Sequence, residues 1–274
     1  MSTRAHVLEV GPEPASRTAW IADVRAHAGV LGVLARKDFQ TRYKRASFGV
    51  LWAVAVPMLQ AAVMAIVFTR VIRVGTGDDF GAYVIAGILA WTYFAGTLMA
   101  SSTSIVDHSG LADKVWFPRI VLVLVPPIAN IVGLLVSYAV LVPLLPVLGV
   151  DLGLRLLLLP VACVLLVAFT VALSLVLSAL HVYYRDVRFL VQAALLVWLY
   201  VTPVVYRQEL LDDLAGAADF NPMTGVVTVF HAATVGAEDG WARPVAVTVV
   251  TTLVLFCVGL ELQRRRDRLF VDQL

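Results

Sequence analysis

Six long and predominantly apolar stretches of the chain contain no Asp, Glu, Lys or Arg, and the segments before, between and after them hold the charged residues. Each stretch is continuously apolar, which favours a helix over the alternating strands of a membrane barrel. A helix that crosses the bilayer needs about 20 apolar residues, and all six stretches are near or above that length. The pattern predicts an all-α polytopic membrane protein with six transmembrane helices, at residues 46–69, 80–106, 120–150, 156–184, 189–206 and 244–260.

The composition agrees with a membrane protein. Hydrophobic residues make up 60% of the 274 positions and charged residues only 15%, whereas a soluble domain has about 45–50% apolar and about 25% charged residues. These values exclude a soluble globular domain and a disordered chain. Cys163 and Cys257 lie in apolar stretches, without the spacing of a metal site or a disulfide framework, so we expect neither.

The positive charges are divided unequally between the connecting segments. If the N-terminus is cytoplasmic, the inner segments hold 16 of the 21 Lys and Arg residues, and the outer segments hold five, of which Arg70 and Arg73 fit least well. Cytoplasmic loops of membrane proteins carry an excess of Lys and Arg. The distribution therefore predicts that both termini lie in the cytoplasm.

The six stretches contain no ionisable side chain of the kind that usually marks ion pathways and proton relays, apart from His181. This argues against a proton-coupled transporter and against catalysis within the membrane, so we expect no catalytic residue and no metal ligand. We interpret His181 as structural. The chain also lacks a phosphate-binding G-x-x-x-x-G-K-[ST] sequence, so energy for uphill transport must come from another chain.

Polar and aromatic side chains within the stretches have two interpretations. Asn130 and Ser137 share a helix face, as do Trp91 and Phe94, because their spacings are close to whole numbers of helical turns. Hydrogen bonding between helices and core packing explain each residue on its own. The alternative is a sugar- or lipid-contacting translocation path, whose candidate residues are Trp52, Gln60, Trp91, Phe94, Asn130, Ser137, Trp198, Thr202 and Tyr206.

The segment before the first stretch has an apolar stripe, in which Leu31, Ala35, Phe39 and Tyr43 recur every four residues. A basic helix lying on the anionic inner leaflet explains it, as does an ordinary positively charged flank. If the segment is such a basic interfacial helix, a functional role follows, in which the cations of the helix contact an anionic headgroup at a gate. These cations are Arg36, Lys37, Arg42, Lys44 and Arg45.

The inner segment between the second and third stretches, residues 107–119, is short and of mixed charge. It holds two large aromatic residues, which we expect to be exposed. Because aromatic and Arg side chains are common anchors of protein interfaces, we predict that this segment docks a cytoplasmic partner. The candidate docking residues are Asp107, His108, Asp113, Lys114, Trp116, Phe117, Pro118 and Arg119.

The outer segment, residues 207–240, follows a helix break at Thr202–Pro203 and contains another at Asn221–Pro222. Two short helices are predicted after these breaks, at residues 208–218 and 223–235. The second is apolar, and backbone at membrane depth must satisfy its own hydrogen bonds. We therefore predict a helix–break–helix hairpin that enters the membrane from the outer face, and the alternative is a surface loop with a short core helix.

Several motifs, in order along the chain, resemble those of ABC-2 type permeases of the polysaccharide-exporter branch. They are Lys37–Asp38–Phe39 with Arg42–Tyr43, Ser47–Phe48–Gly49 with Leu51–Trp52 and Pro57, Lys114–Val115–Trp116–Phe117–Pro118–Arg119, Tyr183–Tyr184–Arg185–Asp186–Val187, Thr202–Pro203–Val204–Val205–Tyr206 and Asn221–Pro222–Met223–Thr224. The similarity covers residues 31–262. Phe48 stands where the family usually has Leu.

This resemblance implies a homodimer of six-helix subunits that docks two copies of a separate ATPase, which binds ATP and Mg. This chain itself would hold no cofactor. It also implies that residues 107–118 form the coupling helix and that the outer segment forms re-entrant helices. The basic helix would then lie at the lateral gate.

Together these observations predict a polar cytoplasmic tail (residues 1–30), a basic interfacial helix (31–46), a transmembrane domain (47–262) and a basic cytoplasmic tail (263–274). The expected function is the permease subunit of an exporter in the bacterial cytoplasmic membrane, which moves a polyprenyl-diphosphate-linked polysaccharide outward. No nucleic-acid partner is expected. The alternatives are an ABC-2 exporter of drugs or small lipids, and a non-transporting scaffold for a cytoplasmic enzyme.

Overall fold

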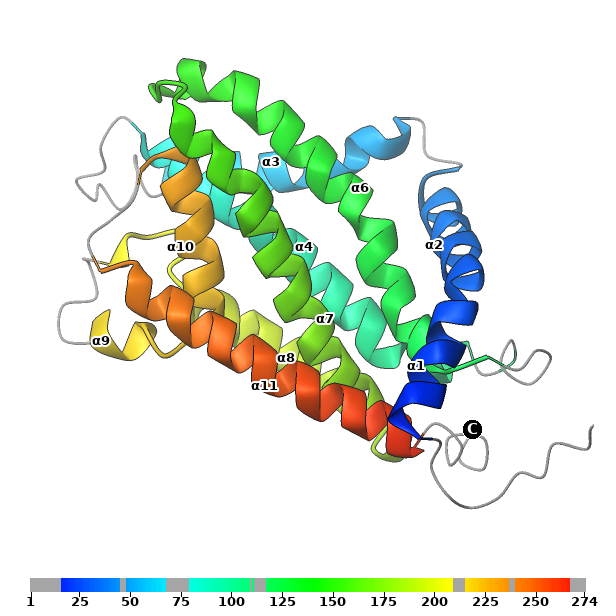
Figure 1. Ribbon diagram of the computed structural model, residues 1–274. Coiled ribbons are helices and arrows are strands. Elements are labelled where there is room, and N and C mark those ends of the chain that lie inside the picture. The colour runs from blue at the N-terminus through cyan, green and yellow to red at the C-terminus, as the bar shows by residue number, and fades with distance from the viewer. Residues whose placement is uncertain are drawn as a thin grey trace, which may run out of the picture.

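The computed structural model describes residues 16–44, 48–67, 79–108, 110, 117–208, 215–236 and 240–266, and this part of the chain is helical without strands. The helices pack side by side in one bundle (Figure 1). Its α-helices are α1 (Arg17–Ala26), α2 (Ala28–Tyr43), α3 (Trp52–Ile66), α4 (Phe80–Asp107), α6 (Ile120–Leu144), α7 (Leu159–Tyr183), α8 (Val187–Val201), α9 (Ala215–Ala218), α10 (Pro222–Thr234) and α11 (Ala242–Arg266), and short 3₁₀ turns include η1 (Gly49–Leu51), η3 (Leu145–Leu148) and η4 (Leu154–Leu158).

Each of the six apolar stretches contains one of these helices. Four of them, α4, α6 with η3, α7 with η4, and α11, are long and apolar enough to cross a membrane. The other two, α3 and α8, have 15 residues each, which corresponds to about 22 Å of helix, less than the hydrocarbon core of about 30 Å. The all-helical class is confirmed with four candidate spans, and the six-span topology stays a prediction.

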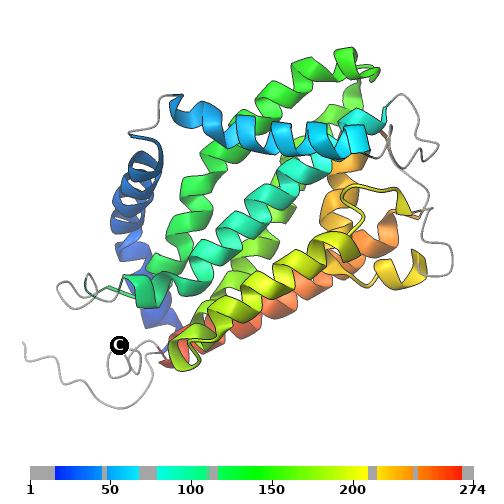
Figure 2. The same cartoon turned by 180° about the vertical axis from the view of Figure 1, so that it is seen from behind.

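Helix α4 lies at the centre of the bundle. Among the four long helices it is the most enclosed, with 72% of its most apolar stretch buried, against 28%, 33% and 17% for the spans of α6, α7 and α11. It packs against α6 and α7 on one side and against α3 and α8 on the other (Figures 1 and 2). The large buried side chains of α4, such as Tyr83, Ile88 and Phe94, therefore form the main core.

The N-terminal region contains a helix that the sequence pattern did not predict. Helix α1 begins at Ser16, whose hydroxyl accepts a hydrogen bond from the Ala19 amide. Its one deeply buried side chain, Trp20, packs against Ile105 and Ile120. Helix α2 follows at once and packs along α6 (Figure 1), so part of the segment expected to be a polar tail belongs to the folded bundle.

The ion pairs between separate elements join segments that the predicted topology places on the same side of the membrane. At one end, Arg188 binds Asp107 at 2.7 Å, and Arg17 of α1 lies 3.5 Å from Glu261 near the end of α11. At the other end, Arg207 binds Asp79 at 2.8 Å. The expected inner and outer segments thus gather at opposite ends of the bundle, hereafter the inner and outer ends (Figure 1).

Candidate functional site

The candidate docking segment begins where α4 ends at the inner end. Asp107 is the last residue of α4, and its carboxylate accepts a hydrogen bond from the Arg188 guanidinium at the start of α8. The next residue, His108, has its ring Nδ1 3.0 Å from the Ser104 carbonyl oxygen. Asp113, Lys114 and Trp116 lie outside the described residues. The described part of the segment therefore connects α4 directly to α8.

Phe117 does not lie where the sequence pattern placed it. The side chain is only 3% exposed and packs with Val121 of α6 against Val30, Leu31 and Leu34 of α2. The expectation of an exposed Phe117 is wrong, because α2 covers the start of α6 and buries the ring. Pro118 and Arg119 are buried too, so this part of the segment supports α2.

The basic side chains of α2 remain accessible to solvent. Arg36, Lys37 and Lys44 are exposed, and Arg42 pairs with Asp38 one turn earlier at 3.2 Å. Arg45 lies outside the described residues. An interfacial helix is expected to present such cations to anionic headgroups, and the apolar contacts with α6 orient α2 so that they face outward.

Three candidate path residues form one aromatic cluster. The ring centroid of Phe94 in α4 lies 5.4 Å from that of Trp91, 5.3 Å from that of Trp198 in α8 and 5.6 Å from that of Phe169 in α7. Phe94 is fully buried. Trp91 also lines a hollow between α4 and α8, together with Phe189 and Gln192. The cluster therefore holds α8 on the core, and Trp91 lies at its edge facing the hollow.

Asn221 connects the end of α8 to the start of α10, a role that the sequence pattern does not reveal. Its Oδ1 accepts hydrogen bonds from Trp198 Nε1 at 2.8 Å and from the Met223 amide at 3.0 Å. Its Nδ2 donates to Thr202 Oγ1 at 2.9 Å. The Asn–Pro sequence indicates a helix cap. It does not indicate the two side-chain partners, Trp198 and Thr202, because they come from the distant α8 and its C-terminal cap.

The remaining candidate path residues lie in separate places. Asn130 donates a hydrogen bond to Thr97 of α4 at 2.9 Å, and buried Ser137 donates to the carbonyl of Gly133 in its own helix. Tyr206 donates to the Tyr200 carbonyl at the outer end. Trp52 and Gln60 lie on the exposed side of α3. The structure thus supports a packing role for most of this set.

The outer segment contains the predicted break and the predicted second helix. Asn221 has extended backbone, Pro222 begins α10, and nearly the whole of α10 is buried among α4, α7 and α11. Of the first predicted helix, residues 208–218, the structure describes α9, and residues 209–214 lie outside the described part. Helix α10 is therefore an integral part of the bundle at its outer end.

Aromatic and ionic contacts at the outer end of α4 hold α10 and the segment that follows α8. The His231 ring stacks on Tyr83 with centroids 3.5 Å apart, and the Tyr83 hydroxyl donates to the Tyr206 carbonyl at 3.0 Å. Arg207 lies over the Tyr83 ring, with its guanidinium carbon 5.5 Å from the centroid, and binds Asp79. These contacts hold the outer ends of α4 and α10 and the segment after α8 together.

Comparison with known proteins agrees with this architecture. The sequence profile described as "ABC-2 type transporter" matches residues 30–234. The chain is 28% identical over 255 residues to an O-antigen export system permease protein of Myxococcus xanthus, covering 90% of this chain and 96% of that protein. It is 26% identical over 249 residues to a protein of the same name from Klebsiella pneumoniae, covering 89% and 94%.

Proposed function

The chain belongs to the ABC-2 type transporter family, and from this we propose that it is the permease subunit of an ATP-driven exporter of a polyprenyl-diphosphate-linked polysaccharide. The observation that carries the proposal is the similarity to O-antigen export permeases over about nine-tenths of the chain. The names of these relatives give a polysaccharide, the O-antigen, as the exported substrate. The chain is a multi-pass membrane protein with several apolar helices. The lack of charge in its apolar stretches suits cargo movement without an ion site.

The energy for export comes from a separate ATPase subunit, which is present in two copies and binds ATP and Mg. Its docking site is the inner end around residues 107–119, where α4 passes into α6. The Asp107–Arg188 pair supports this assignment, because it ties the docking segment to the first turn of α8. A displacement of the docking segment is thereby passed to α8 and to the aromatic cluster that holds it.

The functional unit is a homodimer in which α3 and α8 of the two copies face each other. Large apolar side chains are exposed along both helices, and they include Leu59, Val63, Phe189, Leu196 and Tyr200. Within the described residues both helices are also shorter than the hydrocarbon core, so a second copy would shield their ends from lipid. Trp91 and Gln192, which line the hollow between α4 and α8, together with Trp52 and Gln60 on α3, then border the path.

The exposed cations of α2 bind the diphosphate of the lipid carrier before it enters this path. Arg36, Lys37 and Lys44 are exposed at the inner end, and Lys and Arg groups attract anionic headgroups at the inner leaflet by about 1 kcal/mol each. The buried candidates Phe94, Ser137 and Thr202 position the helices and do not touch cargo in this conformation.

The experiment that tests the function reconstitutes the chain with its ATPase in proteoliposomes loaded with a fluorescent polyprenyl-diphosphate glycan. We expect ATP-dependent appearance of the glycan on the far leaflet, detected by a lectin that cannot cross the membrane. Transport of drugs or short-chain lipids in place of the glycan would favour the small-molecule alternative. ATP hydrolysis without movement of any of these substrates would contradict the exporter assignment.

A further inference from the structure

We propose that a groove between α7, α10 and α11 binds a phospholipid of the outer leaflet, with one acyl chain in the groove and the phosphate beside Arg155. The inference rests on the membrane setting of the chain and not on the nature of its cargo. The groove lies on the lipid-facing side formed by α7 and α11, apart from the α3–α8 face (Figure 1).

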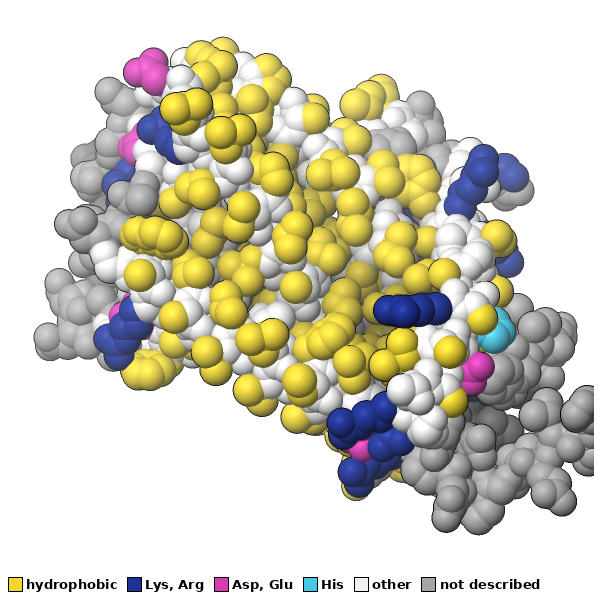
Figure 3. All heavy atoms as spheres, in the orientation of Figure 1, with side chains coloured by type: hydrophobic (Ala, Val, Ile, Leu, Met, Phe, Trp, Pro, Cys, Tyr) yellow, Lys and Arg dark blue, Asp and Glu magenta, His cyan; other side chains and the backbone are white. Residues whose placement is uncertain are grey.

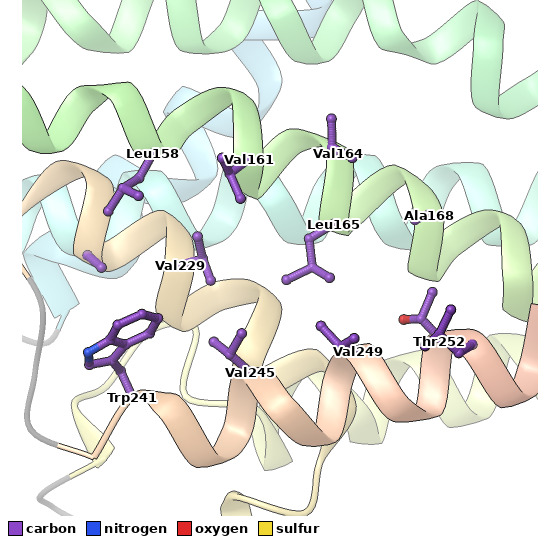
Figure 4. Close-up of a pocket in the computed structure, with 12 residues that line it drawn as sticks. Leu158, Val161, Val164, Leu165, Ala168, Val229, Trp241, Val245, Val249 and Thr252 are labelled. Carbon is purple, nitrogen blue, oxygen red and sulfur yellow. The ribbon is translucent and has the colours of Figure 1, made fainter.

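The groove exists because three helices diverge at the outer end. At the inner half, α7 and α11 are in close contact, since a Cβ added at Gly259 would lie 2.6 Å from the Leu175 Cβ. At the outer half, α10 separates them and forms the floor with buried Val229 and Ala232. Because α10 does not fill the space between the two longer helices, a cavity of about 500 Å³ stays open toward the lipid (Figure 4).

The lining selects a hydrocarbon chain. Leu158, Val161 and Val164 form one wall, Val245 and Val249 form the other, and the single hydroxyl, that of Thr252, already donates to the Thr248 carbonyl. Such a groove offers water few hydrogen bonds, so it stays dry or takes apolar atoms. Hydrophobic side chains also cover the middle of this face, while charged side chains gather toward its two ends (Figure 3).

The dimensions of the groove match one leaflet. From Leu158 to Ala168 the lining covers ten residues of helical rise, or about 15 Å, which is half of the hydrocarbon core of about 30 Å. Trp241 lies at the outer mouth (Figure 4), and Trp is enriched where chains meet headgroups. A chain in the groove would therefore begin at the outer interface and end near the middle of the bilayer.

Arg155 supplies the charge for a headgroup at the same mouth. It precedes Leu158 of the lining by one turn of η4, and its Nη1 would lie 3.9 Å from a Cβ at Gly236, next to the end of α10. One guanidinium nitrogen donates to the Asp151 carbonyl. Its Nε is buried without a hydrogen-bond partner, and within the described residues no carboxylate forms an ion pair with it. A phosphate is the acceptor that such a group suits.

The test is native mass spectrometry of the purified transporter complex, titrated in mild detergent with palmitoyl-oleoyl phosphatidylglycerol or phosphatidylcholine. Val249 lines the groove, whereas neighbouring Val250 is 61% exposed outside it, so Val249→Phe and Val250→Phe are a matched pair. We expect the wild type and Val250→Phe to hold one lipid per chain and Val249→Phe to lose it. If Val249→Phe is not recovered folded, Val164→Phe, which fills the opposite wall, replaces it.

The headgroup is tested separately with Arg155→Gln. We expect this variant to bind both lipids but to lose a preference for anionic phosphatidylglycerol over zwitterionic phosphatidylcholine. Equal lipid binding by Val249→Phe and Val250→Phe would overturn the groove as the binding site of the acyl chain. A wild-type headgroup preference in Arg155→Gln would overturn the placement of the phosphate, and neither result bears on glycan export.

Discussion

A single amide side chain organises the outer end of α8. Asn221 accepts hydrogen bonds from Trp198 and from the first turn of α10, and it donates to Thr202. Trp198 in turn packs edge-on against Phe94. The position of α8 on the core therefore depends on one residue in a loop that is nineteen positions beyond Thr202.

We expect Asn221→Ala to lower the stability of the subunit by about 1–3 kcal/mol, because it leaves the Trp198 N–H without its acceptor and removes the hydrogen bond that the Thr202 hydroxyl accepts. Asn221→Asp keeps the acceptor for Trp198 and for the Met223 amide, so its loss should be smaller. The measurement is the melting temperature of the purified subunit in detergent. Equal melting of the wild type and Asn221→Ala would show that these bonds do not hold α8.

At this scale the sequence identified residue types better than partners. The spacing of Trp91 and Phe94 places them on one helix face, and both belong to one cluster with Trp198 in the structure. Phe117 was expected to be exposed, because the pattern of residues 107–119 gave no sign that α2 would cover it. Burial of a loop residue depends on a helix elsewhere in the chain, and local spacing does not contain that information.

At the scale of elements, α10 packs closely against α11 because Gly225, at their contact, has no side chain. A Cβ at Gly225 would lie 2.2 Å from both the Pro244 carbonyl oxygen and Thr248 Oγ1. Thr248 itself donates to the Pro222 carbonyl at 2.6 Å. The two helices can therefore approach this closely only with Gly at this position.

Gly225→Ala should destabilise the bundle by about 1–3 kcal/mol, the usual cost of overpacking a core. The matched control is Gly29→Ala in α2, where an added Cβ meets no atom within 4 Å and alanine improves helix propensity by about 1 kcal/mol. Thermal unfolding of both variants in the same detergent measures the difference. A Gly225→Ala protein as stable as Gly29→Ala would mean that α10 is loosely placed.

The Asp107–Arg188 pair links α4 to α8, and its two side chains are about equally exposed, at 43% and 45%. Exposed pairs contribute only about 0–1 kcal/mol, so we expect Asp107→Arg and Arg188→Asp to fold normally. Each should lower glycan transport per ATP hydrolysed in proteoliposomes, since the link between docking segment and α8 is then repulsive.

The control for this prediction is the charge-swapped double variant, Asp107→Arg with Arg188→Asp, which restores opposite charges at the same positions. We expect it to recover transport. If it remains as uncoupled as the single variants, the two residues act separately and the pair is not a mechanical link.

At the scale of the whole molecule, the segregation of charged segments gives a direct test of orientation. Tyr184 lies in the turn between α7 and α8, Phe220 lies before α10, and both side chains are strongly exposed. In a chain without Cys163 and Cys257, a cysteine at Phe220 should react with an impermeant maleimide in intact cells. One at Tyr184 should react only after permeabilisation, and the reverse pattern would place the N-terminus outside.

These positions are better probes than buried ones in α10. Val226 and Phe230 are fully enclosed by protein, so resistance to labelling there would report packing and not depth in the membrane. The helical class and the positions of the apolar helices could be predicted, since continuous apolar runs determine both. Helix α1 could not, because it depends on long-range contacts of a segment that is not strongly apolar. For α10 the sequence leaves a re-entrant hairpin and a short core helix open, because only its contacts with α4, α7 and α11 decide between them.

The enclosure of α4 has a consequence for how the protein is made. This helix has the lowest mean hydropathy of the four long spans, and its inner half carries a buried polar row at Thr97, Ser101, Ser102, Thr103 and Ser104. The helices α7, α8 and α10 that cover it come later in the chain, so a ribosome delivers α4 to the bilayer before these three neighbours exist. We expect α4 to stay with the insertion machinery until α7 emerges, and chains truncated after α6 to be degraded by membrane proteases while full-length chains persist.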